Sequence, residues 1–254
     1  KGPEQNANVT YVGKDVTIIA DAVGSGDGGK VVVWADGITR FLGSIFARGG
    51  SSAGDGGQVE VSGKSQLAFR GGVDLSASSG GGGRLLLDPR DLIIDGGATN
   101  AGGGVGTDDA IVGNSVAFAT NTGADTTITE AALEAIAAGA TIDLQAENSI
   151  TVGATPFTAG LTFSNNTSVT FRTRNNTGDV GGSAKTPGIN TSGLAITAQG
   201  SGSLTFYTAD AGTGPGTGGT DAAVSAAIGL GDISTSSGAF VANAEGALAV
   251  GMVN

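Results

Sequence analysis

Cysteine and histidine are absent from the 254 residues, and the chain has only one Trp, one Met and five Pro. The lack of cysteine excludes a disulfide framework and thiol chemistry. The lack of histidine removes the commonest general base of nucleophilic hydrolases and leaves few zinc ligands. No apolar run approaches the length of a membrane-spanning helix, so we expect no membrane span. The first residue is Lys, which favours a mature product or a piece of a longer protein.

Basic residues are also scarce, with 12 Lys and Arg against 23 Asp and Glu and a net charge of −11. An acidic surface repels the phosphates of nucleic acids and anionic lipid headgroups, so we expect neither as a partner. Charged residues make up 14% of the chain and apolar residues 39%, which argues against disorder. Aromatic residues reach only 5%, and this favours a long, thin core over a wide one.

An internal repeat, built on 48 glycines, is the strongest feature of the sequence. Three segments align at offsets of 28 and 26 residues: GDGGKVVVWADG from Gly26, GDGGQVEVSGKS from Gly54 and GGGGRLLLDPRD from Gly80. Phe41 and Phe69, also 28 residues apart, open the segments between them, so each repeat holds at least two short strands. Such a unit cannot bury its apolar face alone, whereas stacked units bury a continuous core.

The repeat length predicts an all-β fold, a right-handed parallel β-helix (β-solenoid) with one short helix and glycine-rich loops. Each strand then pairs with the equivalent strand of the next repeat, and side chains alternate between interior and exterior. The expected register gives two interior columns and one outward column. They are Val31, Val59 and Leu85; Val33, Val61 and Leu87; and, facing outward, Val32, Glu60 and Leu86.

A single elongated domain is expected over 1–254. It comprises a regular block over 14–95, a decorated region over 96–139 and a second block over 140–254. The second block repeats more loosely and contains a glycine-rich insertion. Its strand-like segments open at Thr141, Ser168, Gly193 and Ala239.

The segment Thr127–Gly139 predicts a short helix within the decorated region. Thr127 or Thr129 is the expected N-cap, and Gly139 the expected C-cap. A helix of this length is too short to stand alone, so it must dock on the stack. Its apolar face comprises Leu133, Ile136 and Ala137.

Three runs occur together in the regular block: GGKVVVWADGITRFLGSIFARGG, GDGGQVEVSGKSQLAFRGGVDLSA and GGRLLLDPRDLIID. In combination they resemble the exoproteins of the filamentous haemagglutinin family, which bacteria export by two-partner secretion. The later ITEAALEAIAAGATIDLQAENSITV is similar to the segment that follows in that family, so the likeness covers about residues 14–152. The resemblance implies a right-handed β-helix, export through an outer-membrane transporter, surface display, and roles in adhesion, aggregation or biofilm.

Polysaccharide-active enzymes are the main catalytic alternative, because their chemistry needs paired carboxylates, or calcium with a basic residue, on one exposed face. Asp88, Asp91 and Asp95, with Arg90, are the candidates. Because Asp88 and Asp91 flank Pro89, we favour a turn that ends a strand. We expect no enzyme, and we assign no catalytic, cofactor-binding or metal-ligating residue.

Several polar and aromatic residues leave alternatives open. Calcium is the less favoured interpretation of Asp27 and Asp55 in the GDGG turns and of the pair Asp108–Asp109, since the nonapeptide period of calcium repeats is missing. Asparagines near turns indicate left-handed corners, or else amide ladders inside the stack. These asparagines are Asn165–Asn166, Asn175–Asn176 and Asn190. Arginines expected on the solvated face are Arg70, Arg172 and Arg174, and possible sugar platforms are Trp34, Tyr11 and Tyr207.

These observations favour a secreted or bacterial cell-surface protein with a structural or adhesive role, a rod or fibre subunit. The segments NANVTYVG and AFVANAEGALAVGMVN are strand-like and carry no polar cap, so we expect head-to-tail or strand-donating self-association into filaments. Other expected partners are a surface glycan or protein of a host or neighbouring cell, and an outer-membrane transporter during export. The alternatives are a polysaccharide-active β-helix enzyme and a non-catalytic glycan-binding module.

Overall fold

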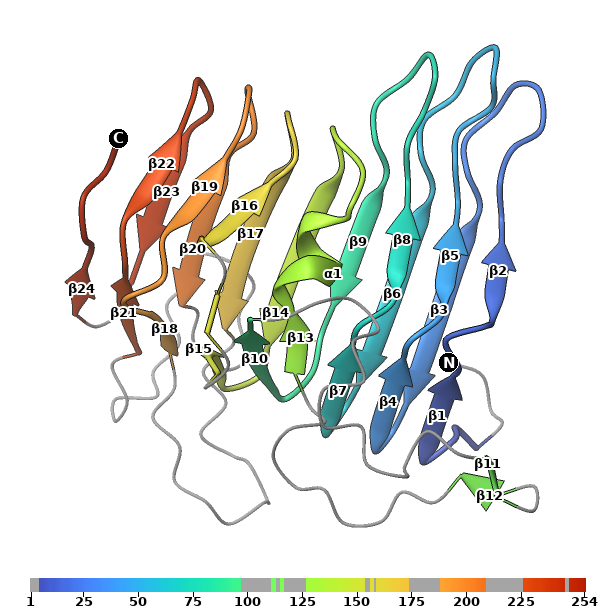
Figure 1. Ribbon diagram of the computed structural model, residues 1–254, viewed down its shortest axis with the longest axis horizontal. Coiled ribbons are helices and arrows are strands. Elements are labelled where there is room, and N and C mark those ends of the chain that lie inside the picture. Colours follow the sequence, from blue (N-terminus) through green and yellow to red (C-terminus); the bar gives the residue numbers. More distant parts are fainter. Residues whose placement is uncertain are drawn as a thin grey trace.

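The computed structural model describes residues 5–96, 111–112, 115–116, 127–153, 156–157, 159–173, 188–208, 226–244 and 247–254. This part of the chain consists mainly of short strands in parallel sheets, with one short helix among them (Figure 1). No helix in the described ranges is long and apolar enough to cross a membrane.

Each of the first three repeats contributes three strands, one to each of three sheets. We call each such set a rung, and the first rung comprises residues 9–35. Consecutive rungs lie side by side along the longest axis of the molecule (Figure 1). The strands are β1 (Val9–Val12), β2 (Thr17–Ile19) and β3 (Lys30–Ala35); β4 (Ile38–Phe41), β5 (Ser44–Phe46) and β6 (Gln58–Gly63); and β7 (Gln66–Phe69), β8 (Gly72–Asp74) and β9 (Arg84–Leu87).

The later elements extend the same sheets. They are β10 (Asp91–Asp95), β11 (Ile111–Val112), β12 (Ser115–Val116), β13 (Thr127–Thr129), α1 (Glu130–Glu134), β14 (Thr141–Ala146), β15 (Ser149–Val152), β16 (Leu161–Phe163), β17 (Ser168–Thr173), β18 (Gly188–Thr191), β19 (Ile196–Ala198), β20 (Leu204–Thr208), β21 (Ala227–Leu230), β22 (Ile233–Thr235), β23 (Phe240–Asn243) and β24 (Leu248–Ala249).

One sheet has nine strands in the order β1-β4-β7-β13-β10-β15-β18-β21-β24, and a second has seven in the order β3-β6-β9-β14-β17-β20-β23. The third position of each rung forms two three-stranded sheets, β2-β5-β8 and β16-β19-β22. All pairings within these four sheets are parallel, and only the small β11–β12 pair is antiparallel. The arrangement is compatible with a β-solenoid.

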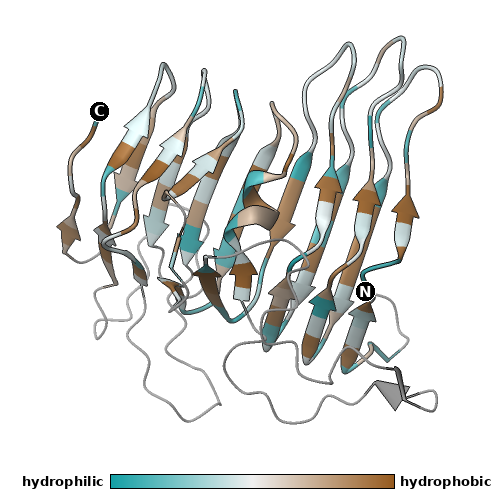
Figure 2. Cartoon of the chain, viewed as in Figure 1, coloured by the Kyte–Doolittle hydropathy of each residue, from teal (hydrophilic) through white to brown (hydrophobic). Residues whose placement is uncertain are grey.

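The predicted register is confirmed in the seven-stranded sheet. Val31 pairs with Val59 and Val59 with Leu85, while Val32 pairs with Glu60 on the outward column. The alternation arises because successive side chains of a strand point to opposite faces, and Figure 2 shows hydrophobic and hydrophilic colours alternating along the strands. Interior side chains from every rung join one core cluster, which includes stacked Phe41 and Phe69 with ring centroids 5.6 Å apart.

Glycine at the corners lets consecutive rungs approach closely. Gly54 has φ +121°, and a Cβ placed on it would lie 2.0 Å from the carbonyl oxygen of Gly26 in the preceding rung. A Cβ on Gly57 would lie 2.2 Å from the carbonyl oxygen of Gly29. The GDGG clusters therefore place backbone against backbone where any side chain would separate the rungs.

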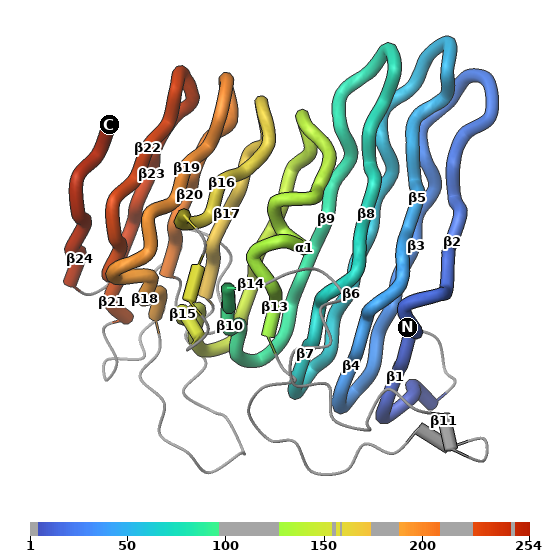
Figure 3. The backbone as a smooth tube through the Cα atoms, viewed as in Figure 1, coloured from blue at the N-terminus to red at the C-terminus, as the bar shows by residue number. Residues whose placement is uncertain are grey.

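The chain departs from regular stacking after β9. β10 continues the nine-stranded sheet, but β13, which follows it in sequence, lies between β7 and β10 (Figure 3). Ile128 of β13 pairs with Phe69 on one side and with Ile94 on the other. The predicted break of the regular stack after residue 95 is therefore a reversal of strand order in one sheet.

The helix is shorter than predicted. α1 spans Glu130–Glu134 only, and Thr127–Thr129 form β13, because their β-branched side chains and backbone complete a sheet. Thr129 is the N-cap residue, but its hydroxyl caps no backbone group, and the helix ends at Ala135, ahead of Gly139. The expected docking is confirmed, since Leu133 and Ile136 are buried in the core.

One alignment in the second block is wrong. The predicted partner of Ser168 opens at Gly193, 25 residues later, but β17 pairs with β20, so that Val169 lies beside Leu204. The segment after Gly193 instead supplies β19 to a different sheet, where Ile196 pairs with Leu161. Connections of unequal length between strands had shifted the apparent repeat.

Candidate functional site

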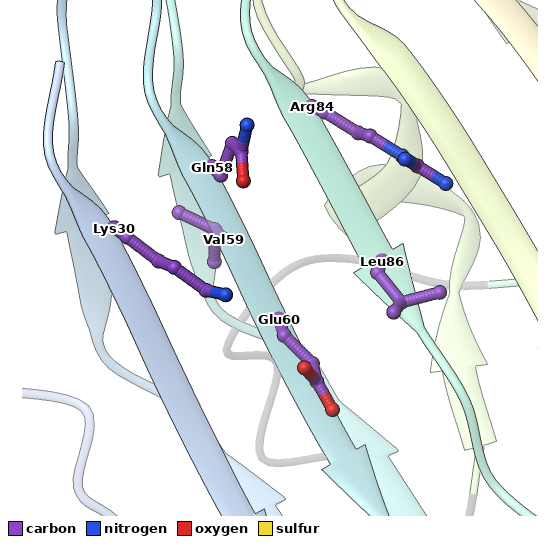
Figure 4. Close-up of a pocket in the computed structure, with 6 residues that line it drawn as sticks. All are labelled: Lys30, Gln58, Val59, Glu60, Arg84 and Leu86. Atoms are coloured by element: carbon purple, nitrogen blue, oxygen red, sulfur yellow. The ribbon is translucent and has the colours of Figure 1, made fainter.

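A shallow hollow of about 200 Å³ lies on the outer face of the seven-stranded sheet (Figure 4). Lys30, Gln58 and Arg84 hold equivalent positions on β3, β6 and β9, so their side chains form a row across three rungs. Glu60 and Leu86 belong to the neighbouring outward column. The hollow is lined by Lys30, Gln58, Val59, Glu60, Arg84 and Leu86.

The charges around this hollow balance. Arg84 donates from Nε to Oδ2 of Asp143 on β14, and the Asp143 side chain is 11% exposed against 57% for Arg84. Lys30 and Glu60 add one charge of each sign at its rim. With long polar side chains around Leu86, the hollow suits an uncharged polar group, and it is smaller than pockets for drug-sized ligands, which start at about 300 Å³.

The candidate carboxylates do not form a catalytic pair in β10. Asp91 and Asp95 project from the same face of the strand, four residues and therefore about 13 Å apart. Glycosidase pairs are separated by about 5 to 9.5 Å. Asp91 accepts hydrogen bonds from Ser149 Oγ at 2.8 Å and from Arg90 Nε at 3.2 Å, and Asp88 lies in the turn that precedes β10.

The aspartates of the GDGG turns bind backbone of the following rung. Oδ1 of Asp27 accepts from the N–H of Asp55 at 2.8 Å, and Oδ1 of Asp55 accepts from the N–H of Gly81 at 2.8 Å. Within the described ranges, no group of three or more Asp or Glu side chains is arranged to hold a metal ion. Asp108 and Asp109, the other calcium candidates, lie outside the described residues.

The same capping from one rung to the next recurs at other corners. Asn166 has φ +62°, as expected for a left-handed corner, and its Oδ1 accepts from the N–H of Ser201 in the next rung at 2.9 Å. Asn190 accepts from the N–H of Ser192 in its own turn at 3.1 Å. Asn165 lies in the turn beside Asn166, and Asn175–Asn176 lie outside the described residues.

Arginine and aromatic candidates occupy mixed positions. Arg70 is only 8% exposed and donates to Thr127 Oγ1 at 3.3 Å, so its predicted place on the solvated face is wrong. Arg172 is half-buried, and Arg174 lies outside the described residues. Trp34 and Tyr207 project outward from β3 and β20 and are half-buried; Tyr11 lies on β1.

The helix substitutes for a strand between β8 and β16. Oε1 of Glu134 accepts from the N–H of Thr162 at 2.7 Å, and Ser164 Oγ donates to the carbonyls of Glu134 and Ile136. Burial raises the pKa of Glu134; the hydrogen bond from Thr162 acts in the opposite direction, and the charge of Glu130 adds to the rise. Side-chain contacts thus replace part of the missing ladder.

Exposed apolar side chains gather at the two ends of the stack. Among the described residues, eight large apolar side chains are exposed, and all lie either in the first rung or after residue 240. These two groups define an N-terminal end surface within 9–35 and a C-terminal end surface within 240–254. Their members are Val16, Ile19, Val23 and Val32, and Val241, Leu248, Met252 and Val253.

Comparison with known proteins gives no match: no family model, no curated protein and no solved structure is similar to this chain. The sequence had indicated the strand-like ends, but the hollow has no motif because its lining residues come from three separate repeats. The polar row Lys30, Gln58 and Arg84, visible in the aligned repeats, was the available signal.

Proposed function

We propose that this chain is a non-enzymatic structural or adhesive segment of a secreted or bacterial cell-surface protein. In this proposal its sheets close into a right-handed parallel β-helix that serves as a rod or fibre subunit, and copies assemble into extracellular filaments. A neighbouring or host cell supplies the surface glycan or protein that it contacts. Export uses an outer-membrane transporter, as in the haemagglutinin-type exoproteins whose sequence runs it resembles.

The continuous core carries this proposal. One cluster of buried side chains extends from Val33 in the first rung to Ile233 near the last. The seven-stranded sheet has six strand spacings, which correspond to about 29 Å of stack. Because each rung contacts mainly its neighbours, such a stack lengthens by adding rungs without changing its width. This is the geometry that a rod requires.

Bead assays test the adhesive role. The purified chain is coated on beads, and clumping of the beads and their attachment to bacterial or host cells are compared with beads coated with an unrelated acidic protein of similar size. We expect the coated beads to clump or attach more strongly than the control beads. Equal behaviour in both assays would refute the adhesive part of the proposal.

The hollow favours glycan binding as a second candidate function. Its polar rim and the apolar Leu86 suit an uncharged sugar, and Trp34 projects from the same sheet face. A glycan array with the native chain, Gln58→Ala and Trp34→Ala tests this candidate, with Thr170→Ala on the same face as the control. Binding that is lost in the first two variants and kept in the control supports a sugar site; no binding by the native chain rejects it.

A further inference from the structure

We propose that two copies of this chain stack head to tail, so that β1 of one copy pairs in parallel with β24 of the other and continues the nine-stranded sheet. The inference rests on the proposed function as a fibre subunit and specifies how the subunits join. The two surfaces involved are the N-terminal and C-terminal end surfaces.

Both partner strands are edges of the same sheet. β1 pairs with β4 alone, and β24 pairs with β21 alone, so each has one side without a strand neighbour. Unpaired edges of this kind are templates for another strand. The nine-stranded sheet is the longest in the molecule, and pairing β24 with β1 of a second copy extends it with the parallel geometry of its existing pairs.

The side-chain columns of this sheet fix the register of the contact. One outward column can be followed without interruption from Tyr11 to Ala249. It passes through Tyr11, Arg40, Ala68, Thr127, Ile93, Thr151, Asn190, Gly229 and Ala249. In-register stacking therefore places Tyr11 of one copy beside Ala249 of the other, and the inward Thr10 beside Leu248.

Apolar exposure points to the same two surfaces. Leu248, Met252 and Val253 are 50%, 64% and 52% exposed at one end, and Ile19 is 70% exposed at the other. Val253 bridges to Ile233, whose column is otherwise buried, so Val253 is the uncovered end of an interior column. Burial of such side chains against a second copy removes apolar surface from water, as it does between rungs within the chain.

A head-to-tail contact differs from a two-fold contact in its strand direction. Two β1 strands, or two β24 strands, related by a two-fold axis would pair antiparallel, whereas every pair in the nine-stranded sheet is parallel. A head-to-tail contact is heterologous and leaves a free end surface on each side, so it propagates into an open filament. The proposed joint therefore accounts for growth as well as for pairing.

Part of the N-terminal end surface stays outside the joint. The connection between β2 and β3 covers residues 20–29, whereas the one between β22 and β23 covers only residues 236–239. The longer loop therefore extends past the strands that stack. Val23, at 94% exposure, lies on this loop and has no counterpart to cover it. Val23 is thus a matched control for Val253.

Cysteine cross-linking tests the register, because the native chain has no cysteine. Tyr11→Cys and Ala249→Cys are made as separate proteins, mixed and oxidised. In-register parallel partners lie about 4.8 Å apart, inside the range of about 4.4 to 6.8 Å that a disulfide spans between Cα atoms. Ala247→Cys, two residues off register at about 8 Å, is the control for Ala249→Cys.

We expect a mixed dimer on a denaturing gel from Tyr11→Cys with Ala249→Cys, at a yield several-fold above that with Ala247→Cys. No mixed dimer, equal yields from the two pairings, or dimers formed mainly by Tyr11→Cys or Ala249→Cys alone would overturn the proposal. A joint that fails while coated beads still attach to cells rejects the stacking mode only. A joint that forms while beads do not attach rejects the adhesive role only.

Charge substitution gives a second readout that does not depend on oxidation. Val253→Asp places an unpaired carboxylate in the joint and is expected to weaken self-association about tenfold or more in analytical ultracentrifugation. Val23→Asp adds the same charge outside the joint and is expected to leave association unchanged. Circular dichroism confirms that both variants fold. Equal effects of the two substitutions would contradict the proposed joint.

Discussion

Alanine at two equivalent glycines separates backbone strain from rung stacking. Gly26 and Gly54 hold the same place in consecutive rungs, with φ +117° and +121°. A Cβ on Gly54 would lie 2.0 Å from the carbonyl oxygen of Gly26, whereas a Cβ on Gly26 would have nothing within 4 Å. Gly54→Ala therefore meets both the strain and the preceding rung, and Gly26→Ala meets the strain alone.

The expected magnitudes follow from these two terms. An alanine in a left-handed conformation costs about 1–2 kcal/mol, and both variants carry that cost. The contact at Gly54 is with backbone, which no side-chain rotation relieves, so we add about 1–3 kcal/mol for overpacking. Gly26→Ala is expected to lose about 1–2 kcal/mol and Gly54→Ala about 2–5 kcal/mol of unfolding free energy.

Trp34 provides the assay, because it is the only tryptophan and lies on β3, between the two glycines in sequence. Urea unfolding followed by its fluorescence reports on the rungs concerned, even if a stacked array does not unfold as one unit. Gly24→Ala is the control, since nothing lies within 4 Å of a Cβ there. Equal losses for Gly26→Ala and Gly54→Ala would refute the reasoning.

Three further predictions concern stability. Leu85→Ala deletes a fully buried side chain between fixed rungs and is expected to cost about 3–5 kcal/mol in urea unfolding, against about 1 kcal/mol for the outward Leu86→Ala; equal costs would contradict the register. Burial raises the pKa of Glu134 above its ordinary 4.5, so the folded state keeps a proton that the unfolded state loses, and stability falls as pH rises through that window. Glu134→Gln stays neutral and is expected to remove this fall in melting curves recorded across the window; an unchanged slope would argue against it. The side-chain hydrogen bond from Arg48 lowers the pKa of Asp21, so that stabilisation is present above 3.8 and is lost as pH falls through the lowered pKa; Asp21→Asn should flatten this acid limb, and an unaltered limb would count against the pair.

The regular block was predictable from sequence because its repeat length is constant. Val31, Val59 and Leu85 align at offsets that the glycine clusters mark, and the alternation of side chains then fixes which face is buried. The same logic failed at Gly193, because connections of unequal length moved the true partner of Ser168 to the start of β20.

Strand order and outward contacts were beyond the reach of sequence patterns. Nothing in Thr127–Thr129 shows that β13 pairs between β7 and β10, since pairing depends on where the chain returns in space. Arg70 is buried although its neighbours resemble a solvated turn, because β13 brings Thr127 within hydrogen-bonding distance. The hollow is equally hidden, since Lys30 and Arg84 are separated by two repeats.

Distances between spin labels along the outward column test the parallel stack most directly. The column includes Val32, Leu86, Thr170, Thr205 and Val241. With one label replacing Val32, the second label is expected at about 10, 19, 24 and 29 Å at the other four positions in turn, one strand spacing for each rung. Distances that do not increase in this order, or that place Leu86 and Val241 equally far from Val32, would contradict the account.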